Sequence, residues 1–208
     1  MPSPSSAAPT RPPGSIADRL WNAARGEFAL RGYHGARVQG IARRAGCNVA
    51  LLYRHWASKK GLYLEVLREI CLATNRLLDQ AAERREGAVG MVRAYLEAMS
   101  ADGEGAQILI REYLDGGPFL LQLIVDDPAL GNTLARYSAA LTVGPEDQRL
   151  RAELNPRLAL ITIFGLSSLV SASETSAQPF LEAPTPIERR KEHLTDILLH
   201  GMLAPRAR

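Results

Sequence analysis

Apolar residues in the first third of the chain recur three and four positions apart, the spacing that places them on one face of a helix. Two such stripes follow one another, with their members facing inward: Val38, Ile41, Ala42 and Ala45, then Val49, Leu52, Tyr53 and Trp56. Gly46 between them is suited to end a helix in the left-handed conformation, because it has no Cβ to clash. Asn48 is suited to cap the next helix by accepting a hydrogen bond from a first-turn N–H group. The pattern predicts two short helices joined by a tight turn.

Helices are also predicted on either side of this pair. The first spans residues 15–31, where Ser15 and Asp18 resemble a capping box, and Gly32 ends it. Its inward stripe consists of Ile16, Leu20, Ala24 and Phe28. The second begins after Ser58, its natural cap, and carries the chain out of this module. Two helices joined by a short turn that contains Gly form a helix-turn-helix, a motif that places its second helix in the DNA major groove.

Beyond this module, Gly, Pro and Asp residues divide the chain into further predicted helices. They span 91–100, 106–114 and 128–141, and two more start at Asn155-Pro156 and Thr185-Pro186. The run 102–105 is expected to end the first of them. The segment 158–170 is apolar on nearly every side, so protein must cover more than one of its faces. We predict an all-α fold, with an N-terminal three-helix bundle followed by a larger helical domain.

The charge distribution divides the chain at the same place. The protein has 208 residues and a net charge of +3. Residues 15–60 contain nine basic and two acidic side chains, a net charge of +7, whereas residues 61–208 carry a net charge of −5. A basic N-terminal module on an acidic remainder is typical of a DNA-binding protein with a separate body. A hydrophobic content of 46% with 6% aromatic residues suits a helical protein with an ample core.

Other classes of protein find little support in the sequence. Residues 1–14 are rich in Pro, Ser and Ala and lack the pattern of a signal peptide. We expect them to be disordered, with a contact between Arg11 and DNA as the alternative. No apolar run reaches the roughly 18 residues that span a bilayer, so we expect a cytoplasmic protein. Without a phosphate loop, nucleophile elbow or HExxH motif, we expect neither an enzyme nor a cofactor.

Two weaker candidates for a sensing role remain open. His193, Asp196 and His200 recur at i, i+3 and i+7 on the predicted last helix, a spacing that suits either metal ligands or a plain surface. Cys47 lies in the turn before the recognition helix, where its oxidation would disturb DNA docking. Neither Cys47 nor Cys71 has metal or redox spacing, so we expect no metal site.

Three segments of the basic module resemble the DNA-binding domain of the TetR family of bacterial transcriptional regulators. They are FALRGYHGA (28–36), IARRAG (41–46) and LYRHWASKKGL (52–62). The resemblance covers roughly residues 15–62, and these motifs in this order are more specific than a lone helix-turn-helix. It implies DNA binding by residues 15–61 and effector binding with dimerisation by the helical domain 62–208. Ala36, Val49 and Ala57 depart from residues common in the family, so the operator sequence does not follow from relatives.

The recognition helix and the helix before it carry the candidate DNA contacts. The exposed face of the recognition helix offers Asn48, Ala50, Leu51 and Arg54. The start of the preceding helix adds Arg37 and Gln39. Ala50 and Leu51 suit thymine methyl groups, and Arg54 suits guanine or a phosphate. The positions that match phosphate-contacting residues of the family are Tyr53, His55 and Lys59.

The resemblance also implies an effector pocket and a dimer interface in the C-terminal domain. Candidate pocket residues are Tyr95, Met99, Arg111, Phe119 and Phe164. Arg111 would suit an acidic ligand, with a surface salt bridge as the alternative. Candidate interface residues, on the last two helices, are Leu160, Gly165, Ser168, Leu194, Ile197 and Leu198. The alternative is that these two helices complete the core of a monomer.

Together these features predict a homodimeric DNA-binding regulator, a repressor that a small-molecule effector releases from an inverted-repeat operator. An activator of the same fold is the first alternative. An effector-independent or architectural DNA-binding protein is the second, and it would show strong salt dependence with little sequence discrimination. The third is a helical enzyme that retains the motif, which a substrate-turnover screen would identify.

Overall fold

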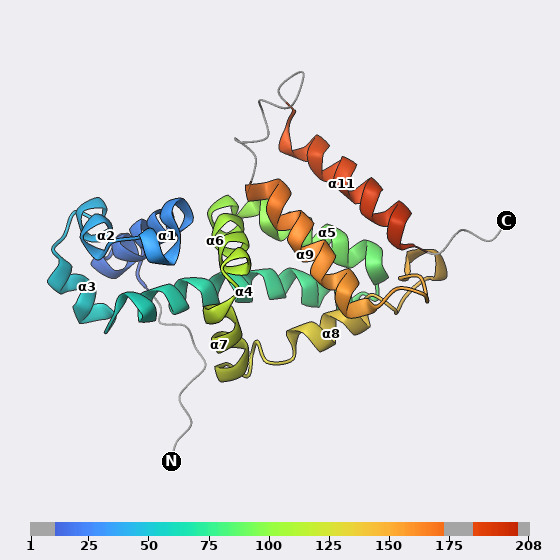
Figure 1. Ribbon diagram of the computed structural model, residues 1–208, viewed down its shortest axis with the longest axis horizontal. Coiled ribbons are helices and arrows are strands. Elements are labelled where there is room, and N and C mark those ends of the chain that lie inside the picture. Colours follow the sequence, from blue (N-terminus) through green and yellow to red (C-terminus); the bar gives the residue numbers. More distant parts are fainter. Residues whose placement is uncertain (1–10, 173–184, 204–208) are drawn as a thin grey trace, which may run out of the picture. The chain divides into compact units, whose positions relative to one another are not determined.

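The computed structural model describes residues 11–172 and 185–203, and these residues fold into α-helices (Figure 1). One isolated backbone bridge joins Leu150 to Leu203, and no β-strand forms within the described ranges. The predicted all-α fold is confirmed. Residues 1–10 of the segment predicted to be disordered lie outside the described residues. None of the described helices is both long enough and apolar enough to cross a membrane.

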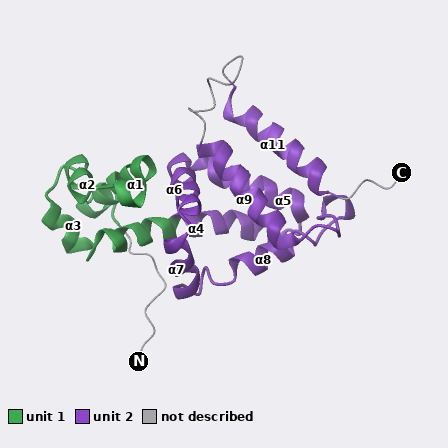
Figure 2. Cartoon of the chain, in the orientation of Figure 1, with its two compact units in different colours: residues 1–69 green, residues 70–208 purple. Residues whose placement is uncertain are grey.

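Backbone contacts divide the protein into two compact units, residues 1–69 and 70–208 (Figure 2). The boundary falls within α4 (Lys59–Glu83), so one helix begins in the first unit and ends in the second. The first unit contains the predicted helix-turn-helix, and the second contains the remaining helices.

The first unit is built from α1 (Ile16–Gly35), α2 (Val38–Arg44), α3 (Val49–His55) and the start of α4. Ser15, Asn48 and Ser58 each accept a side-chain hydrogen bond from the backbone N–H three residues later, at 3.1, 3.0 and 3.0 Å. These are the three caps predicted from the sequence. Gly46 adopts a φ of 67° after α2, as predicted, and Gly32 adopts a φ of 66°. Gly32 interrupts α1 rather than ending it, because one more helical turn follows.

Apolar side chains from all four helices meet in the core of this unit. Its fully buried members include Leu20, Phe28, Ile41, Leu52, Leu62 and Val66. Two residues predicted to face inward do not: Tyr53 is 48% exposed and Ile16 is 37% exposed. Helix α3 is only seven residues long, and its inward positions are taken by Leu52 and Trp56. Tyr53 follows Leu52 directly, so it points about 100° away around the helix axis.

Within residues 70–172 and 185–203, the second unit contains the end of α4 and seven further elements. They are α5 (Gly87–Ala101), α6 (Gly103–Leu114), α7 (Pro118–Asp126), α8 (Thr133–Ala140), the short 3₁₀-helix η1 (Glu146–Gln148), α9 (Pro156–Ala172) and α11 (Ile187–Met202). Helix α9 packs against α5, α6, α8 and α11, which confirms that this apolar helix is covered by protein on more than one side (Figure 1). Asn155 caps it as predicted, since its Oδ1 accepts from Arg157 N at 3.0 Å.

Three helix starts in this unit differ from the sequence prediction. Helix α5 begins at Gly87, four residues before the predicted start at Met91. The Asp102 carboxylate accepts a hydrogen bond of 2.9 Å from Gly105 N, so the run that was expected only to end one helix also begins α6. Helix α8 begins at Thr133 rather than at Pro128, because Asp127 starts a turn instead of a helix. In that turn Asp127 Oδ1 accepts from the backbone N–H two residues later, at 2.9 Å.

Candidate DNA interface and ligand cavity

Most of the predicted DNA-contact side chains lie on the exposed surface of the first unit. The exposed members are Arg37, Gln39, Asn48, Ala50, Tyr53, Arg54 and His55, whereas Leu51 and Lys59 are half-buried. Leu51, Arg54 and His55 border one surface hollow together with the start of α1. The second helix of the motif therefore presents a free outer face while Leu52 and Trp56 anchor its inner face.

Several cations of this unit lack an internal partner. Within the described part of the chain, no ion pair involves Arg37, Arg43 or Arg54. Arg44 differs from them, because its Nη2 lies 3.5 Å from Oε2 of the buried Glu27. These three guanidinium groups can bind a phosphate without first breaking an internal ion pair. Their free state therefore favours contacts with a nucleic acid backbone.

Lys59, a predicted phosphate contact, directs its ammonium group into the first unit. Its Nζ donates hydrogen bonds to the carbonyl oxygens of Tyr33 and Ala36, at 2.8 and 3.1 Å. The same nitrogen lies 4.4 Å from the centre of the Tyr33 ring. These contacts tie the start of α4 to the end of α1 and occupy two of the three ammonium hydrogens.

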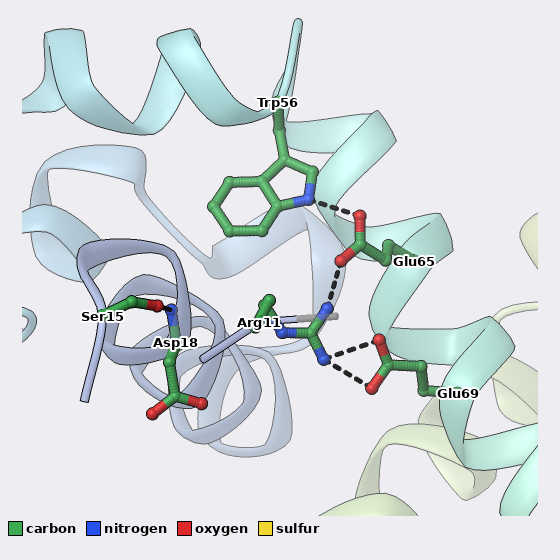
Figure 3. A network of polar contacts seen from close by, with 6 residues as sticks. All are labelled: Arg11, Ser15, Asp18, Trp56, Glu65 and Glu69. Atoms are coloured by element: carbon green, nitrogen blue, oxygen red, sulfur yellow. Dashed lines mark hydrogen bonds and ion pairs between the residues drawn. The ribbon is translucent and has the colours of Figure 1, made fainter. Parts of the chain in front are cut away.

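Arg11 takes part in a network that links three parts of the first unit (Figure 3). Its guanidinium pairs with Glu65 and with Glu69, the latter at 2.6 Å, and lies 4.3 Å from the centre of the Trp21 ring. Glu65 Oε2 also accepts a hydrogen bond of 2.6 Å from Trp56 Nε1, at the C-cap of α3. In this structure Arg11, which the sequence offered as a possible DNA contact, binds α1 and α4 instead.

The second unit contains a cavity of about 390 Å³, lined by side chains from α4 to α9. This volume falls within the range of roughly 300 to 1,000 Å³ that is typical of small-molecule sites. Of the predicted effector residues, Tyr95 and Phe164 line the cavity and pack edge-to-face with ring centres 5.3 Å apart. Met99 is buried beside Ser168, with Ser168 Oγ 3.4 Å from its Sδ.

The other three predicted effector residues, Met99, Arg111 and Phe119, lie outside the lining. Arg111 is exposed on α6, and the backbone N–H of Phe119 donates to Glu112 Oε1 at 2.7 Å. Most lining residues, including Asn75 and Thr133, were not predicted from the sequence, because the lining comes from elements far apart in the chain. One signal was available: Thr74 and Asn75 interrupt the apolar stripe of α4 with polar groups.

The ionisable groups buried at this cavity are held in their neutral forms. Burial, and secondarily the charge of Glu112, raises the pKa of the Cys71 thiol to about 12. Burial is also the main cause that raises the pKa of Tyr95 well above its ordinary value. The pKa of Tyr137 is raised by burial and then by its hydrogen bond to Asp79, at 2.9 Å. None of these three groups therefore brings a charge to the cavity near neutral pH.

The predicted interface residues fall into two groups. Leu160, Ser168, Leu194 and Leu198 are buried within the unit, and Leu160 also lines the cavity. Ile197 is 54% exposed, and Gly165 is half-buried with open space where a Cβ would stand. Helix α9 also exposes apolar side chains that the prediction did not include, namely Leu158, Leu166 and Leu169. The described residues therefore leave an apolar face along α9 exposed.

The remaining sensing candidates are placed as follows. His200 Nδ1 lies 3.0 Å from Asp196 Oδ1 on the exposed side of α11. Across the described ranges, no three His, Cys, Asp or Glu side chains come close enough together to hold a metal ion. Cys47 is half-buried and forms no disulfide.

Comparison with known proteins gives consistent matches. The family model described as bacterial regulatory proteins, tetR family, matches residues 20–66. The HTH-type transcriptional activator FasR of Mycolicibacterium smegmatis is 28% identical over 167 residues, which cover 78% of this chain and 70% of the relative.

Two solved structures share the fold over nearly the whole chain. The ketosteroid transcriptional regulator KstR2 of Mycobacterium tuberculosis has a TM-score of 0.68 at 20% identity, covering 97% of this chain and 100% of that one. FadR of Bacillus subtilis, in complex with stearoyl-CoA, has a TM-score of 0.63 at 19% identity, covering 88% of this chain and 97% of that one.

A helix-turn-helix with an exposed, capped second helix and unpaired cations beside it defines a DNA-binding regulator. The motif, the matching family model and the similar regulators all indicate a helix-turn-helix transcriptional regulator. The first unit is a DNA-binding domain of the tetR family of bacterial regulatory proteins, and the chain as a whole is similar to transcriptional regulators.

Proposed function

We propose that this protein binds a specific operator as a homodimer and represses transcription until a small molecule in the cavity of the second unit releases it from DNA. In this proposal residues 15–61 bind DNA, and residues 62–208 bind the effector and dimerise. The observation that carries the proposal is the free outer face of α3, with Arg54 unpaired among the described residues and Asn48 capping the helix.

The recognition helix would read base edges in the major groove. Arg54 offers a bidentate donor for guanine or phosphate, and Ala50 and Leu51 offer apolar contact to thymine methyl groups. Tyr53 is exposed, as a phosphate contact requires, and His55 is exposed beside it. The free arginine side chains would add phosphate contacts without sequence preference.

Dimerisation would cover the apolar face that remains on α9 and α11. Leu158, Leu166 and Leu169 on α9 and Ile197 on α11 are exposed in the single chain. Contiguous exposed apolar surface on a helical unit commonly marks a protein interface. A two-fold dimer would place two copies of α3 about 34–36 Å apart, one turn of B-DNA, and would read an inverted repeat.

Release by an effector requires that the ligand prefer one conformation of the protein. If the ligand favours a form in which the two recognition helices no longer fit adjacent grooves, DNA and ligand weaken each other reciprocally. A coupling free energy of about 2 to 3 kcal/mol would change operator affinity by roughly 30- to 150-fold. The cavity supports this part, as does the stearoyl-CoA ligand of the similar FadR structure.

Activation is the second candidate, because the similar protein FasR is described as a transcriptional activator. A reporter gene behind the operator distinguishes the two. Deletion of the protein raises expression if it is a repressor and lowers expression if it is an activator.

The DNA-binding part is tested by the salt dependence of operator affinity, measured by fluorescence anisotropy. Arg54→Ala should weaken binding and, if Arg54 contacts a phosphate, lower the slope of log affinity against log salt by about 0.9. Arg84→Ala makes the same change of charge in the second unit and should leave both values unchanged. Equal binding by Arg54→Ala and the unaltered protein would show that α3 is not the recognition helix.

A further inference from the structure

The cavity of the second unit has a neutral lining. Among the described residues that border it there is no Arg, Lys, Asp or Glu side chain. Most of its wall is aliphatic or aromatic, from Leu78 and Leu109 at the buried side to Ile161 on α9. Burial also keeps the thiol of Cys71 protonated, because it raises the pKa of that group to about 12. Such a wall favours an apolar ligand and offers no charge to pair with an anion.

Asn75 is the polar group of this wall with unused hydrogen-bonding capacity. Its side chain is almost fully buried, at 7% exposure. Within the described part of the chain its amide makes one contact, from Nδ2 to Thr133 Oγ1 at 3.5 Å, the outer limit of a hydrogen bond. A buried amide can form up to four hydrogen bonds, and leaving them unmade is costly. The cavity therefore needs a polar atom from a ligand or from water beside Asn75.

The two threonine side chains near Asn75 determine which kind of polar atom fits. Thr74 Oγ1 donates its proton to Ile70 O at 3.0 Å, and Thr133 Oγ1 donates to Leu130 O at 2.7 Å. With those protons engaged, both hydroxyl oxygens present lone pairs, so they act as acceptors toward the cavity. The amide of Asn75 adds both a donor and an acceptor. A ligand hydroxyl can donate to these oxygens and accept from Asn75, and a neutral carbonyl can accept from Asn75, whereas a carboxylate would bring a charge that no lining side chain neutralises.

Other parts of the lining are aliphatic or aromatic and partly exposed. Tyr113, Leu121, Leu134 and Ile161 line the cavity and are also in contact with solvent. These exposed lining residues mark the side from which a ligand enters. The polar group of the ligand would thus lie at the buried end, and its apolar body would extend toward the opening.

We propose that the cavity takes an uncharged, mostly apolar molecule whose hydroxyl or carbonyl group forms hydrogen bonds with Asn75 at the buried end. This inference rests on the proposed function, in which the cavity is the effector site. It disfavours ligands that would place a simple alkyl end there, as an acyl chain with its charged group at the opening would do. Such an end would exclude water from Asn75 without replacing the hydrogen bonds.

Calorimetric titration of the full chain with a matched series of probes tests the ligand class. The probes are 1-decanol, decanoate and decyltrimethylammonium, each below its aggregation concentration at pH 7.5. They share one alkyl chain and differ in the charge of the head group. We expect 1-decanol to bind about 10-fold or more tightly than either ion, because the cavity cannot neutralise an ion. Binding of decanoate within twofold of 1-decanol would overturn the proposal.

Variants then test whether Asn75 recognises the polar group. Asn75→Leu should weaken 1-decanol binding about 3- to 10-fold, the effect of one lost hydrogen bond. Asn132→Leu makes the same change at an exposed position outside the lining and should leave binding unaltered. If Asn75→Leu does not fold, as judged by circular dichroism, Thr133→Val replaces it and should also weaken 1-decanol. Unchanged affinity in the folded variant would overturn the assignment.

The same probes separate this inference from the proposed function. Release of labelled operator DNA, followed by anisotropy, reports the effector role, whereas calorimetry without DNA reports only the ligand class. Preferential 1-decanol binding that leaves DNA bound would support the ligand class and contradict the release of DNA. Release of DNA by decanoate, with no binding of 1-decanol, would support an effector cavity and overturn the proposed class.

Discussion

Trp56 Nε1 donates a hydrogen bond of 2.6 Å to Glu65 Oε2, while the other oxygen of the same carboxylate pairs with Arg11 (Figure 3). Trp56 is the C-cap residue of α3, and Glu65 lies in the second turn of α4. One carboxylate therefore fixes the end of the recognition helix to α4 and to the segment before α1. We expect the position of α3, the proposed recognition helix, to depend on this interaction.

Replacing Glu65 should destabilise the first unit. Glu65→Ala removes the acceptor for Trp56 and the ion-pair partner of Arg11, and we expect a loss of about 1 to 3 kcal/mol in the free energy of unfolding. Urea unfolding followed by tryptophan fluorescence measures it, since both tryptophans, Trp21 and Trp56, belong to this unit. Glu65→Gln keeps an acceptor for Trp56, so its free energy of unfolding should fall by less than that of Glu65→Ala. Equal stability of Glu65→Ala and the unaltered protein would contradict the role given to this carboxylate.

Lys59→Met distinguishes an internal role from a phosphate contact. Two carbonyl oxygens lose their donor in this variant, so we expect the free energy of unfolding to fall by about 1 to 2 kcal/mol. The salt slope of DNA binding should stay the same if Lys59 Nζ remains on these carbonyls in the complex. Arg43→Met, at an exposed position of the same unit, is the control for stability. A slope lower by about 0.9 with unchanged stability would instead establish the phosphate contact that the family resemblance implies.

Cys71 should react slowly with thiol reagents in the folded protein. Because its pKa is raised to about 12, little thiolate forms at pH 8, and only the thiolate is a strong nucleophile. In a Cys47→Ser background, we expect labelling by a disulfide reagent at pH 8 to be much slower in native than in urea-unfolded protein. A ligand in the cavity should slow it further, since Cys71 lines that cavity. Equal rates in native and unfolded protein would contradict the burial of this thiol.

The raised pKa of Cys71 also makes stability depend on pH. Between the ordinary value of 9.0 and about 12, the unfolded chain loses the thiol proton while the folded protein keeps it. The stabilising contribution of the neutral thiol is therefore complete below pH 9 and is lost as the pH rises through this window. Cys71→Val removes the titration, so its free energy of unfolding should fall less between pH 8 and pH 10. An identical fall in both proteins would show that other groups control this range.

A charge on the outer face of α9 should prevent dimerisation. Leu169 is 51% exposed, and Leu169→Glu would place a carboxylate inside the proposed interface, where it has no partner. Light scattering after size exclusion at micromolar concentration should show a monomer for this variant and a dimer for the unaltered protein. Val125→Glu, at an 82% exposed apolar position on α7, is the control and should remain a dimer. A dimeric Leu169→Glu would place the interface elsewhere.

How far the sequence predicts this protein depends on whether a feature is local. The caps at Ser15, Asn48 and Ser58 and the turn at Gly46 follow from neighbouring residues, and the structure confirms them. The outward position of Tyr53 was missed because a seven-residue helix has few inward positions. An apolar residue at helical spacing is then not sufficient evidence for burial.

The cavity lining was the least predictable part, because it depends on packing between distant segments. Asn75 on α4 meets Thr133 on α8 across 58 positions of sequence, and no local pattern links them. Similarly, Arg11 belongs to the segment 1–14, which composition predicts to be disordered. Its ion-pair partners lie on α4, more than 50 positions later in the sequence. Aromatic character was enough to place Tyr95 and Phe164 at the cavity, but it did not distinguish them from Phe119.

The most direct test of the central claim is selection of bound sequences from random duplex DNA by the purified full chain at physiological salt. We predict a short inverted repeat whose half-sites lie one helical turn apart, and loss of its enrichment in Arg54→Ala. Recovery of no common sequence, with binding that only weakens as salt rises, would contradict a sequence-specific regulator and leave a DNA-binding protein without a defined operator.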